Sequence, residues 1–199
     1  MSFKKNDYKI LKKVLPKEFT RFIFNYFILK RQIAATLSTE NAAGYRSPFV
    51  GRWDDPQVPN TYSHYGEPAM ETLLWWLKPT MEKATNLKLI ETYSYARIYN
   101  KGSILKKHTD RESCEISTTL NLGGDTWPIY LEKNKQKIEV NLLPGDMLIY
   151  RGCKLKHWRY KFKGNCCAQV FLHYNKKDDS LANKYDGRPH LGLPSRFKK

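Results

Sequence analysis

Two histidines and one aspartate carry the clearest chemical signal in this sequence. His108-Thr109-Asp110 puts an imidazole and a carboxylate two residues apart, and in extended backbone such residues project from the same face. His157 comes 47 residues after Asp110, on a later strand that a folded-over sheet can bring back beside the first. Two histidines and one carboxylate leave three coordination positions of a metal open, as in non-haem Fe(II) centres. Spacing alone also fits packed or solvated residues, so the surrounding elements must decide.

The composition predicts one folded domain without a membrane segment. Of the 199 residues, 41% are hydrophobic and 14% aromatic, which is too much apolar material for a disordered basic tail. The longest uncharged apolar runs, such as Phe22–Leu29, are far shorter than the roughly 20 residues that span a bilayer. The sequence shows no secretory signal pattern, and its four cysteines contain no C-x-x-C pair. We therefore expect a cytoplasmic protein with reduced thiols.

The net charge leaves two interpretations open. The chain has 35 Lys and Arg against 19 Asp and Glu, a formal net charge of +16. Such a charge suits an acidic partner such as nucleic acid. The basic residues are spread along the whole chain, however, which is also typical of a lysine-rich solvated surface. A nucleic-acid partner is therefore possible but not favoured.

Helical periodicity is confined to the first part of the chain. Apolar residues recur at three- and four-residue steps over 19–37, which predicts an amphipathic helix. A second helix is expected to begin near Pro68, to be interrupted at Pro79 and to resume through Met81. Between the two helices, 38–66 is irregular and rich in Pro and Gly, which is typical of a functional loop. Its aromatic residues predict that the loop is ordered: Tyr45, Phe49, Trp53, Tyr62 and Tyr65.

From residue 87 the hydrophobic period changes to two, which predicts strands. The expected strands are 88–100, 115–122, 127–131, 137–142, 147–151, 155–160 and 166–174, with one more at 9–14. Strands that follow helices in this way favour a mainly β protein with flanking helices, in which an antiparallel barrel or sandwich carries helices on one face. We expect a single domain with three parts: helical support and a substrate loop (1–86), a β core (87–175) and a polar tail (176–199).

Four motifs follow one another in a specific order between residues 87 and 174. The strand at 95–102 ends in Tyr-x-x-Gly, with Tyr99 nine residues before His108. The His-x-Asp pair comes next, and it is followed by the strand 116–121. Pro144-Gly145-Asp146 then opens an aromatic-ended strand that precedes His157. This series resembles the prolyl-4-hydroxylase-like branch of the 2-oxoglutarate/Fe(II)-dependent oxygenases. The strings at 65–68, 111–117 and 157–159 look like an uncharacterised bacterial and phage subgroup.

The resemblance implies a double-stranded β-helix, a jelly-roll or cupin-like barrel, with two N-terminal helices. It implies that His108, Asp110 and His157 bind Fe(II) and act as the catalytic centre, with 2-oxoglutarate as cosubstrate and O2 as oxidant. By position, Tyr99 and Thr119 would donate hydrogen bonds to 2-oxoglutarate. From the residues alone, both are equally compatible with ordinary strand positions in the core.

One feature departs from the branch. Its members carry an Arg or Lys nine or ten residues after the second histidine, where it pairs with the far carboxylate of 2-oxoglutarate. Here those positions are Cys166 and Cys167. Arg159 is two residues after His157 and so on the same strand face, and it is the best substitute because a guanidinium can hold a carboxylate with two bonds. A solvated strand residue is the alternative, and Gln169 could add hydrogen bonds without charge.

Other polar residues are less informative. Arg111 could orient Asp110 or face the substrate, or it could pair on the surface with Glu112 or Glu115. His64 and His173 are expected to be structural or loop residues. We predict that the loop 38–66 forms one wall of the active-site mouth, with Arg46 and Arg52 available to grip a substrate.

The predicted function is hydroxylation of a C–H bond. The resemblance favours a peptide or protein side chain as substrate, although a small molecule is also compatible. The alternative is a non-catalytic cupin-like module that binds nucleic acid or another polyanion through its basic surface. The complete His-x-Asp and His set weighs against that alternative. No membrane partner is expected, and the sequence predicts no oligomeric state.

Overall fold

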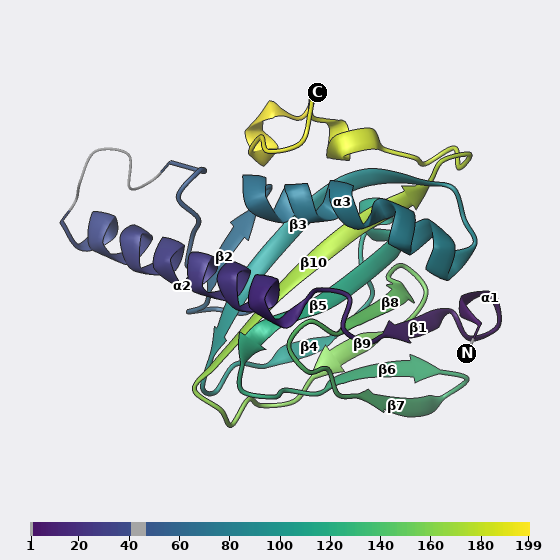
Figure 1. Cartoon of the computed structure of the whole chain (residues 1–199), viewed down its shortest axis with the longest axis horizontal. Helices are drawn as coiled ribbons and strands as arrows, with labels where there is room; N and C mark the ends of the chain where they lie inside the picture. Colours follow the sequence, from purple (N-terminus) through teal and green to yellow (C-terminus); the bar gives the residue numbers. More distant parts are fainter. Residues whose placement is uncertain (1, 41–46) are drawn as a thin grey trace.

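Two antiparallel sheets face each other, and helices cover the outer side of the larger one (Figure 1). The computed structural model describes residues 2–40 and 47–199. The larger sheet has the strand order β1-β8-β5-β10-β3-β2, and the smaller has the order β4-β9-β6-β7. The helices are α1 (Phe3–Asn6), α2 (Lys17–Thr39) and α3 (Pro68–Thr85). The strands are β1 (Tyr8–Leu11), β2 (Tyr62–Tyr65), β3 (Leu89–Asn100), β4 (Leu105–His108), β5 (Ile116–Gly124), β6 (Ile129–Lys133), β7 (Gln136–Val140), β8 (Met147–Arg151), β9 (His157–Arg159) and β10 (Cys166–Lys176).

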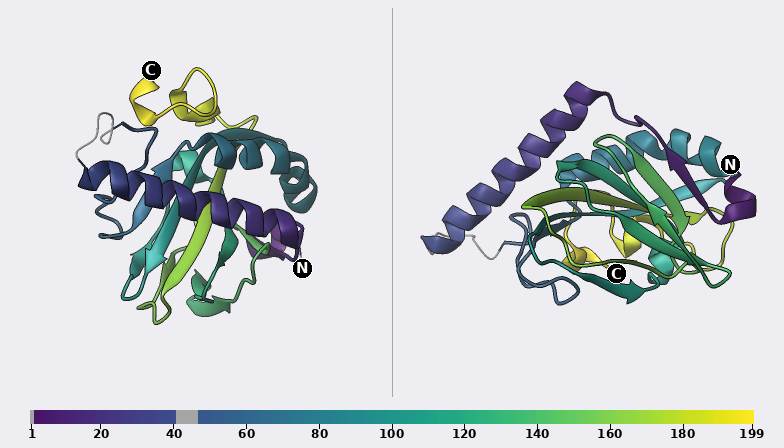
Figure 2. Two further views of the ribbon diagram at one scale, coloured as in Figure 1. Left: turned by 60° about the vertical axis from the view of Figure 1, so that its left-hand side comes forward. Right: turned by 90° about the horizontal axis from the view of Figure 1, so that it is seen from below.

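Helices α2 and α3 lie across β3, β5 and β10 and cover the main core (Figure 2). Glu67 joins the two helices because its buried carboxylate caps the Met70 backbone N–H at 3.0 Å and also accepts hydrogen bonds from Tyr26 and Lys30. This contact explains why the charged Lys30 lies on the inner side of α2. Burial raises the pKa of the Tyr26 hydroxyl, and its hydrogen bond to Glu67 adds to that shift.

Helix α3 continues through Pro79 without a break, so the predicted interruption is wrong. Pro79 lies on the exposed side of the helix, next to the strongly exposed Trp75. The backbone carbonyl that the proline leaves without its N–H partner can there be hydrated, which reduces the cost of a proline inside the helix. The C-terminal end of the predicted loop 38–66 was also predicted incorrectly, because residues 62–65 form strand β2 beside β3.

Most of the predicted strands are present at nearly the predicted positions. The hydrophobic pattern does not indicate the short helix α1 or the strands β2 and β4, and it predicts the first strand at 9–14, whereas β1 is Tyr8–Leu11. These elements are four residues long, too short for a clear hydrophobic period. The outcome is a mainly β, jelly-roll-like architecture, as the period-two pattern predicts.

Alternation along the central strands separates the core from the site. On β3, Ala96 and Ile98 are buried in the main core under the helices. Tyr95, Arg97 and Tyr99 therefore point the other way, into the space between the two sheets. This inner face is buried but polar, which is unusual for a sheet interior and indicates a candidate functional site.

The C-terminal segment after β10 is tied to the rest of the fold by ion pairs. Arg188 is 3% exposed and pairs with Glu71 of α3 at 2.8 Å. Asp186 is 1% exposed and binds Arg111, Lys198 and Tyr65. The segment therefore lies over the molecule, as expected, but it is fixed by buried charges. Within the described residues, no helix is long and apolar enough to cross a membrane.

Candidate active site

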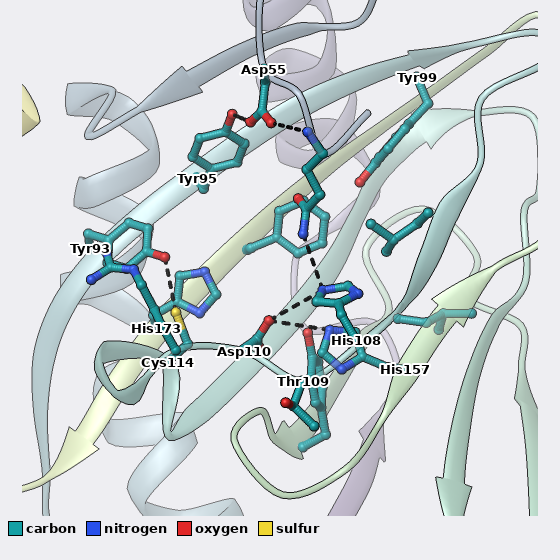
Figure 3. A pocket seen from close by; sticks show the side chains of 16 residues that line it. Asp55, Tyr93, Tyr95, Tyr99, His108, Thr109, Asp110, Cys114, His157 and His173 are labelled. Carbon is teal, nitrogen blue, oxygen red and sulfur yellow. Dashed lines mark hydrogen bonds and ion pairs between the residues drawn. The ribbon is translucent and has the colours of Figure 1, made fainter. Parts of the chain in front are cut away.

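The structure brings His108, Asp110 and His157 together between the two sheets. His108 is the last residue of β4, and it lies directly opposite His157 of β9 in the antiparallel register. Asp110 follows β4, where its backbone N–H donates to the carbonyl of Gly152 at 2.9 Å. Its Oδ1 lies 3.6 Å from Nε2 of His108 and 3.4 Å from Nε2 of His157 (Figure 3). A cross-strand pair and a turn therefore create the cluster from distant parts of the sequence.

The donor atoms fit a metal ion. One ligand atom from each of the three residues lies within 4.8 Å of the others. Nδ1 of His108 lies 2.7 Å from the Lys106 carbonyl, and Nδ1 of His157 lies 3.0 Å from the Leu155 carbonyl. Both carbonyls can only accept, so each neutral imidazole keeps its proton on Nδ1 and leaves the Nε2 lone pair free for a metal.

The carboxylate of Asp110 is held by its neighbours. Ser117 on β5 donates to Oδ2 at 2.9 Å, which leaves Oδ1 turned toward the two imidazoles. Burial alone would raise the pKa of Asp110, but in the metal-free protein hydrogen bonds from protonated His108 and His157 outweigh it and hold the pKa well below its usual range. A side chain at Gly152 would clash with this carboxylate and with the Cys114 carbonyl, so the position needs glycine.

A cavity of about 320 Å³ opens over the cluster. Four of the predicted site residues line it: Tyr99, His108, Asp110 and His157. The predicted residues Thr119 and Arg159 do not line it and lie fully buried behind this wall. The remaining lining residues are Asp55, Gln57, Tyr93, Tyr95, Leu105, Thr109, Arg111, Cys114, Ile129, Tyr150, Phe171 and His173.

Arg159 and Thr119 are direct neighbours at the inner end of the site. Nη2 of Arg159 donates to the Thr119 hydroxyl at 3.3 Å, and Nη1 donates to the carbonyl of Trp127. Thr119 in turn donates to Gln169 at 2.9 Å. The guanidinium lies 5.0 Å from the Trp127 ring centroid, and its positive charge acts to lower the pKa of the buried Tyr99, which burial raises. The alternative interpretation of Arg159 as a solvated strand residue is therefore wrong.

Arg159 has no ionic partner in the described part of the chain. It forms no ion pair, and its Nε has no hydrogen-bond partner among those residues, although the side chain is 1% exposed. Cys167, ten residues after His157, lies in the same buried cluster as Tyr99 and Trp127, where the Arg159 charge acts to lower the thiol pKa that burial raises. A buried guanidinium without a counter-ion is costly, and the usual reason for keeping one is an anionic ligand.

A second buried arginine was not predicted from the sequence. Arg97 of β3 pairs with Asp55 at 2.5 Å and donates to Gln57 at 3.3 Å. Gln57 also reaches His108, with the Nε2 atoms of the two side chains 3.2 Å apart. The alternation Tyr-Ala-Arg-Ile-Tyr gave a usable signal, because it puts Arg97 on the same face as Tyr99.

The loop before β2 contributes to the site in a narrower way than predicted. Asp55 and Gln57 form part of the cavity wall. Trp53 and Tyr62 instead pack against each other in a tilted arrangement, with ring centroids 5.0 Å apart, and Tyr65 stacks on Tyr93 at 4.9 Å, so these aromatics hold the chain in place. Arg52 pairs with its exposed neighbour Asp54. Tyr45 and Arg46 lie outside the described residues.

The remaining candidates have structural partners. Arg111 lines the cavity but pairs with Asp186 through two bonds of 2.8 and 2.7 Å, so the alternative of a surface pair with Glu112 or Glu115 is wrong. His173 is buried on β10 with Nδ1 2.9 Å from the Ser117 hydroxyl, and burial lowers its pKa to about 4. Burial likewise lowers the pKa of His64 on β2 to about 4.

Several solved structures of similar shape are prolyl hydroxylases, 2-oxoglutarate/Fe(II) oxygenases or other enzymes dependent on α-ketoglutarate. The chain matches a Pseudomonas putida prolyl-4-hydroxylase with a TM-score of 0.64 and 12% identity, over 88% of this chain and 95% of that one. It matches HygX of Streptomyces hygroscopicus, solved with nickel, 2-oxoglutarate and hygromycin B, with a TM-score of 0.61 and 13% identity, over 96% and 94%. It also matches the α-ketoglutarate-dependent epimerase SnoN of nogalamycin biosynthesis, with a TM-score of 0.65 and 12% identity, over 99% and 94%.

These likenesses define the class of fold. Comparison of the sequence with protein-family models and with curated proteins gives no match. The structural matches nevertheless cover almost the whole chain, and they confirm the fold relationship to 2-oxoglutarate/Fe(II) oxygenases that the ordered motifs indicate. At these identities the likeness concerns the fold, and the chemistry has to be argued from the site.

Proposed function

We propose that this protein is a 2-oxoglutarate- and Fe(II)-dependent oxygenase with a double-stranded β-helix fold, and that it hydroxylates a C–H bond of its substrate. One observation carries the proposal: the short strand β9 presents a metal-fitting histidine, His157, and two residues later a buried cation, Arg159, that has no ionic partner among the described residues. The first belongs to a cluster that suits Fe(II), and the second suits the far carboxylate of a dicarboxylate. The oxygenase fold of the neighbours supports the same conclusion.

The chain's own residues would bind and orient the reactants. His108, Asp110 and His157 would hold Fe(II), which would supply the oxidation of the substrate coupled to decarboxylation of 2-oxoglutarate to succinate. Arg159 would pair with the distal carboxylate, and the hydroxyls of Thr119 and Tyr99 would donate hydrogen bonds to the cosubstrate. The surrounding buried side chains would exclude water and so strengthen these contacts.

Two substrate classes follow from the neighbours. The prolyl-hydroxylase-like fold favours a peptidyl side chain, as the sequence motifs do. The likeness to HygX, solved with hygromycin B, favours a small molecule. A purely polyanion-binding module is not favoured, because such a module has no use for a cavity with three converging metal donors.

Succinate formation from 2-oxoglutarate tests the proposal. Fe(II)-loaded protein should convert 2-oxoglutarate slowly to succinate without a substrate, and His108→Ala and Asp110→Ala should abolish this turnover. His190→Ala is the matched control, because His190 is exposed in the C-terminal segment. Turnover that persists in Asp110→Ala, or that falls equally in the His190 variant, would contradict the proposed centre.

A further inference from the structure

We propose that Arg97 and Tyr95 form the binding site for a carboxylate of the substrate, which the chain's own Asp55 occupies in this structure. The proposal rests on the hydroxylase function proposed above, because that function would hydroxylate the acid that binds here. It assigns small carboxylic acids, free amino acids among them, as the substrate class.

Arg97 is an enclosed cation beside the cavity. Its side chain is 1% exposed, and within the described residues its Nε has no hydrogen-bond partner. The guanidinium lies 5.2 Å from the ring centroid of Tyr95 and 5.6 Å from that of Tyr99. Because it is shielded from water on all sides, leaving this charge without an anionic acceptor would be costly.

The present acceptor comes from an irregular stretch, residues 53–60, which we call the covering segment. Asp55 accepts hydrogen bonds from Arg97 and from the Tyr95 hydroxyl. The segment is anchored elsewhere, by the buried Val58 and by the bridge between Arg52 and Ser63. Asp55 can therefore leave Arg97 through a local change, without the loss of a helix or a strand.

Access to Arg97 requires that change. Asp55 and Gln57 line the cavity and Arg97 does not, so these two side chains stand between the cavity and the guanidinium. A substrate that displaced Asp55 without bringing an anion would leave Arg97 buried and unpaired. A carboxylate restores both the charge and the acceptor for Tyr95, whereas an uncharged peptide carbonyl restores only a hydrogen bond.

The distance to the metal-fitting cluster limits the size of the substrate. The single carboxamide of Gln57 spans from Arg97 Nη1, at 3.3 Å, to His108 Nε2, at 3.2 Å. A carboxylate in the place of Asp55 therefore has its own next few carbon atoms beside His108. A short acid presents a C–H bond there, and a long chain is not needed to reach it.

Ligand-observed NMR on the metal-free protein tests the proposal, with butyrate and its uncharged isostere butyramide as probes. Wild-type protein should bind butyrate in preference to butyramide. Asp55→Asn keeps the shape of the competing side chain but removes its charge, so butyrate should bind roughly tenfold more tightly, the equivalent of about 1.4 kcal/mol. Arg97→Gln should lose the binding, and Arg97→Lys should recover part of it.

Several results would overturn the carboxylate site. These are absence of butyrate binding in both wild type and Asp55→Asn, unchanged affinity in Asp55→Asn, or equal binding of butyramide or of an amide-capped dipeptide. Loss of binding in Arg159→Gln together with its retention in Arg97→Gln would place the probe at Arg159 and would also refute it. The Asp55 variant keeps Arg97, so the test does not depend on a variant that removes a buried charge.

The measurement contains neither metal nor 2-oxoglutarate, which separates it from the test of the proposed function. If succinate formation fails but butyrate binds through Arg97, the hydroxylase proposal falls and the carboxylate site stands. If turnover occurs but butyrate does not bind, only the carboxylate site falls.

Discussion

Arg97 and Arg159 project from different sheets, β3 and β9, and each is 1% exposed. Both charges act on Tyr99, each lowering a hydroxyl pKa that burial raises. Arg97 is paired with Asp55 at 2.5 Å. Arg159 reaches only neutral acceptors in the described chain, the Thr119 hydroxyl and the Trp127 carbonyl. Two chemically identical side chains in one interior therefore have different electrostatic surroundings.

This difference in ion pairing indicates that the two arginines bind different ligands. A cation without a counter-ion is prepared for an anion that arrives from outside, and burial makes the resulting pair strong. A cation that already has an internal carboxylate can take an outside anion only by exchange, so it discriminates between ligands as well as binding them. We infer that Arg159 serves the cosubstrate, which is common to all turnovers, and that Arg97 serves the substrate.

The largest expected effect is on the affinity for 2-oxoglutarate, which should depend on Arg159 much more than on Arg97. Removing one partner of a buried charge pair commonly costs about 3–5 kcal/mol, so Arg159→Ala should weaken 2-oxoglutarate binding by roughly 10²–10³-fold. Arg159→Lys should recover only part, because a point charge cannot reproduce a two-bond grip. Calorimetry with Fe(II)-loaded protein measures this directly. A change of less than about threefold in Arg159→Ala, or a larger change in Arg97→Ala, would reverse the assignment.

A smaller effect is expected on the stability of the metal-free protein. Arg97→Met leaves the Asp55 carboxylate without its partner and should lower the free energy of unfolding by about 2 kcal/mol. Arg159→Met removes an unpaired charge and two hydrogen bonds, which offset each other, so the change should stay below about 1 kcal/mol. Urea unfolding of both variants provides the comparison. Equal losses would show that the two arginines have equivalent surroundings.

The smallest effect is a pH dependence that only Arg97 should show. Burial acts to raise the pKa of Asp55, but the Tyr95 hydrogen bond and the Arg97 charge hold it below the ordinary 3.8. A carboxyl whose pKa is lowered in the folded state contributes stability above its ordinary pKa and loses it as the pH falls further.

The amide oxygen that Asp55→Asn introduces can still accept from Arg97 and Tyr95, so the substitution removes only the charge of the pair. The stability difference from wild type should therefore be about 1 kcal/mol at neutral pH and should shrink below pH 3.8. Unfolding curves at a series of pH values measure that difference. The corresponding difference for Arg159→Met should not change over the same range, because no carboxylate of the described chain pairs with it. A constant difference for Asp55→Asn would mean that the pair contributes nothing to folding.

The sequence predicted the parts of the site that depend on local spacing. The His-x-Asp pair and His157 are recognisable because strand alternation and motif order determine where they project. Arg159 followed from the same reasoning, since it is two residues from His157. The mainly β fold and the long helices α2 and α3 were predictable because their hydrophobic periods extend over many residues.

The parts that depend on tertiary pairing could not be predicted. Asp55 and Gln57 lie about 40 residues before Arg97, in a segment without any periodicity, and only the folded chain brings them together. Likewise, Arg159 has no ionic partner among the described residues because the folded chain surrounds it with neutral groups, and no local sequence pattern indicates that. The sequence left the role of Arg111 open, and the only ion-pair candidates it offered were the neighbours Glu112 and Glu115, whereas the folded chain supplies Asp186 from the C-terminal segment.

The most direct test of the central claim is the absorption spectrum of the metal-free protein after addition of Fe(II) and then 2-oxoglutarate under anaerobic conditions. We predict a weak visible metal-to-ligand charge-transfer band that requires both additions. It should be absent in His108→Ala, and in Arg159→Ala it should need roughly 10²–10³-fold more 2-oxoglutarate. A band of unchanged intensity and concentration dependence in both variants would contradict the assignment of the metal cluster and of Arg159.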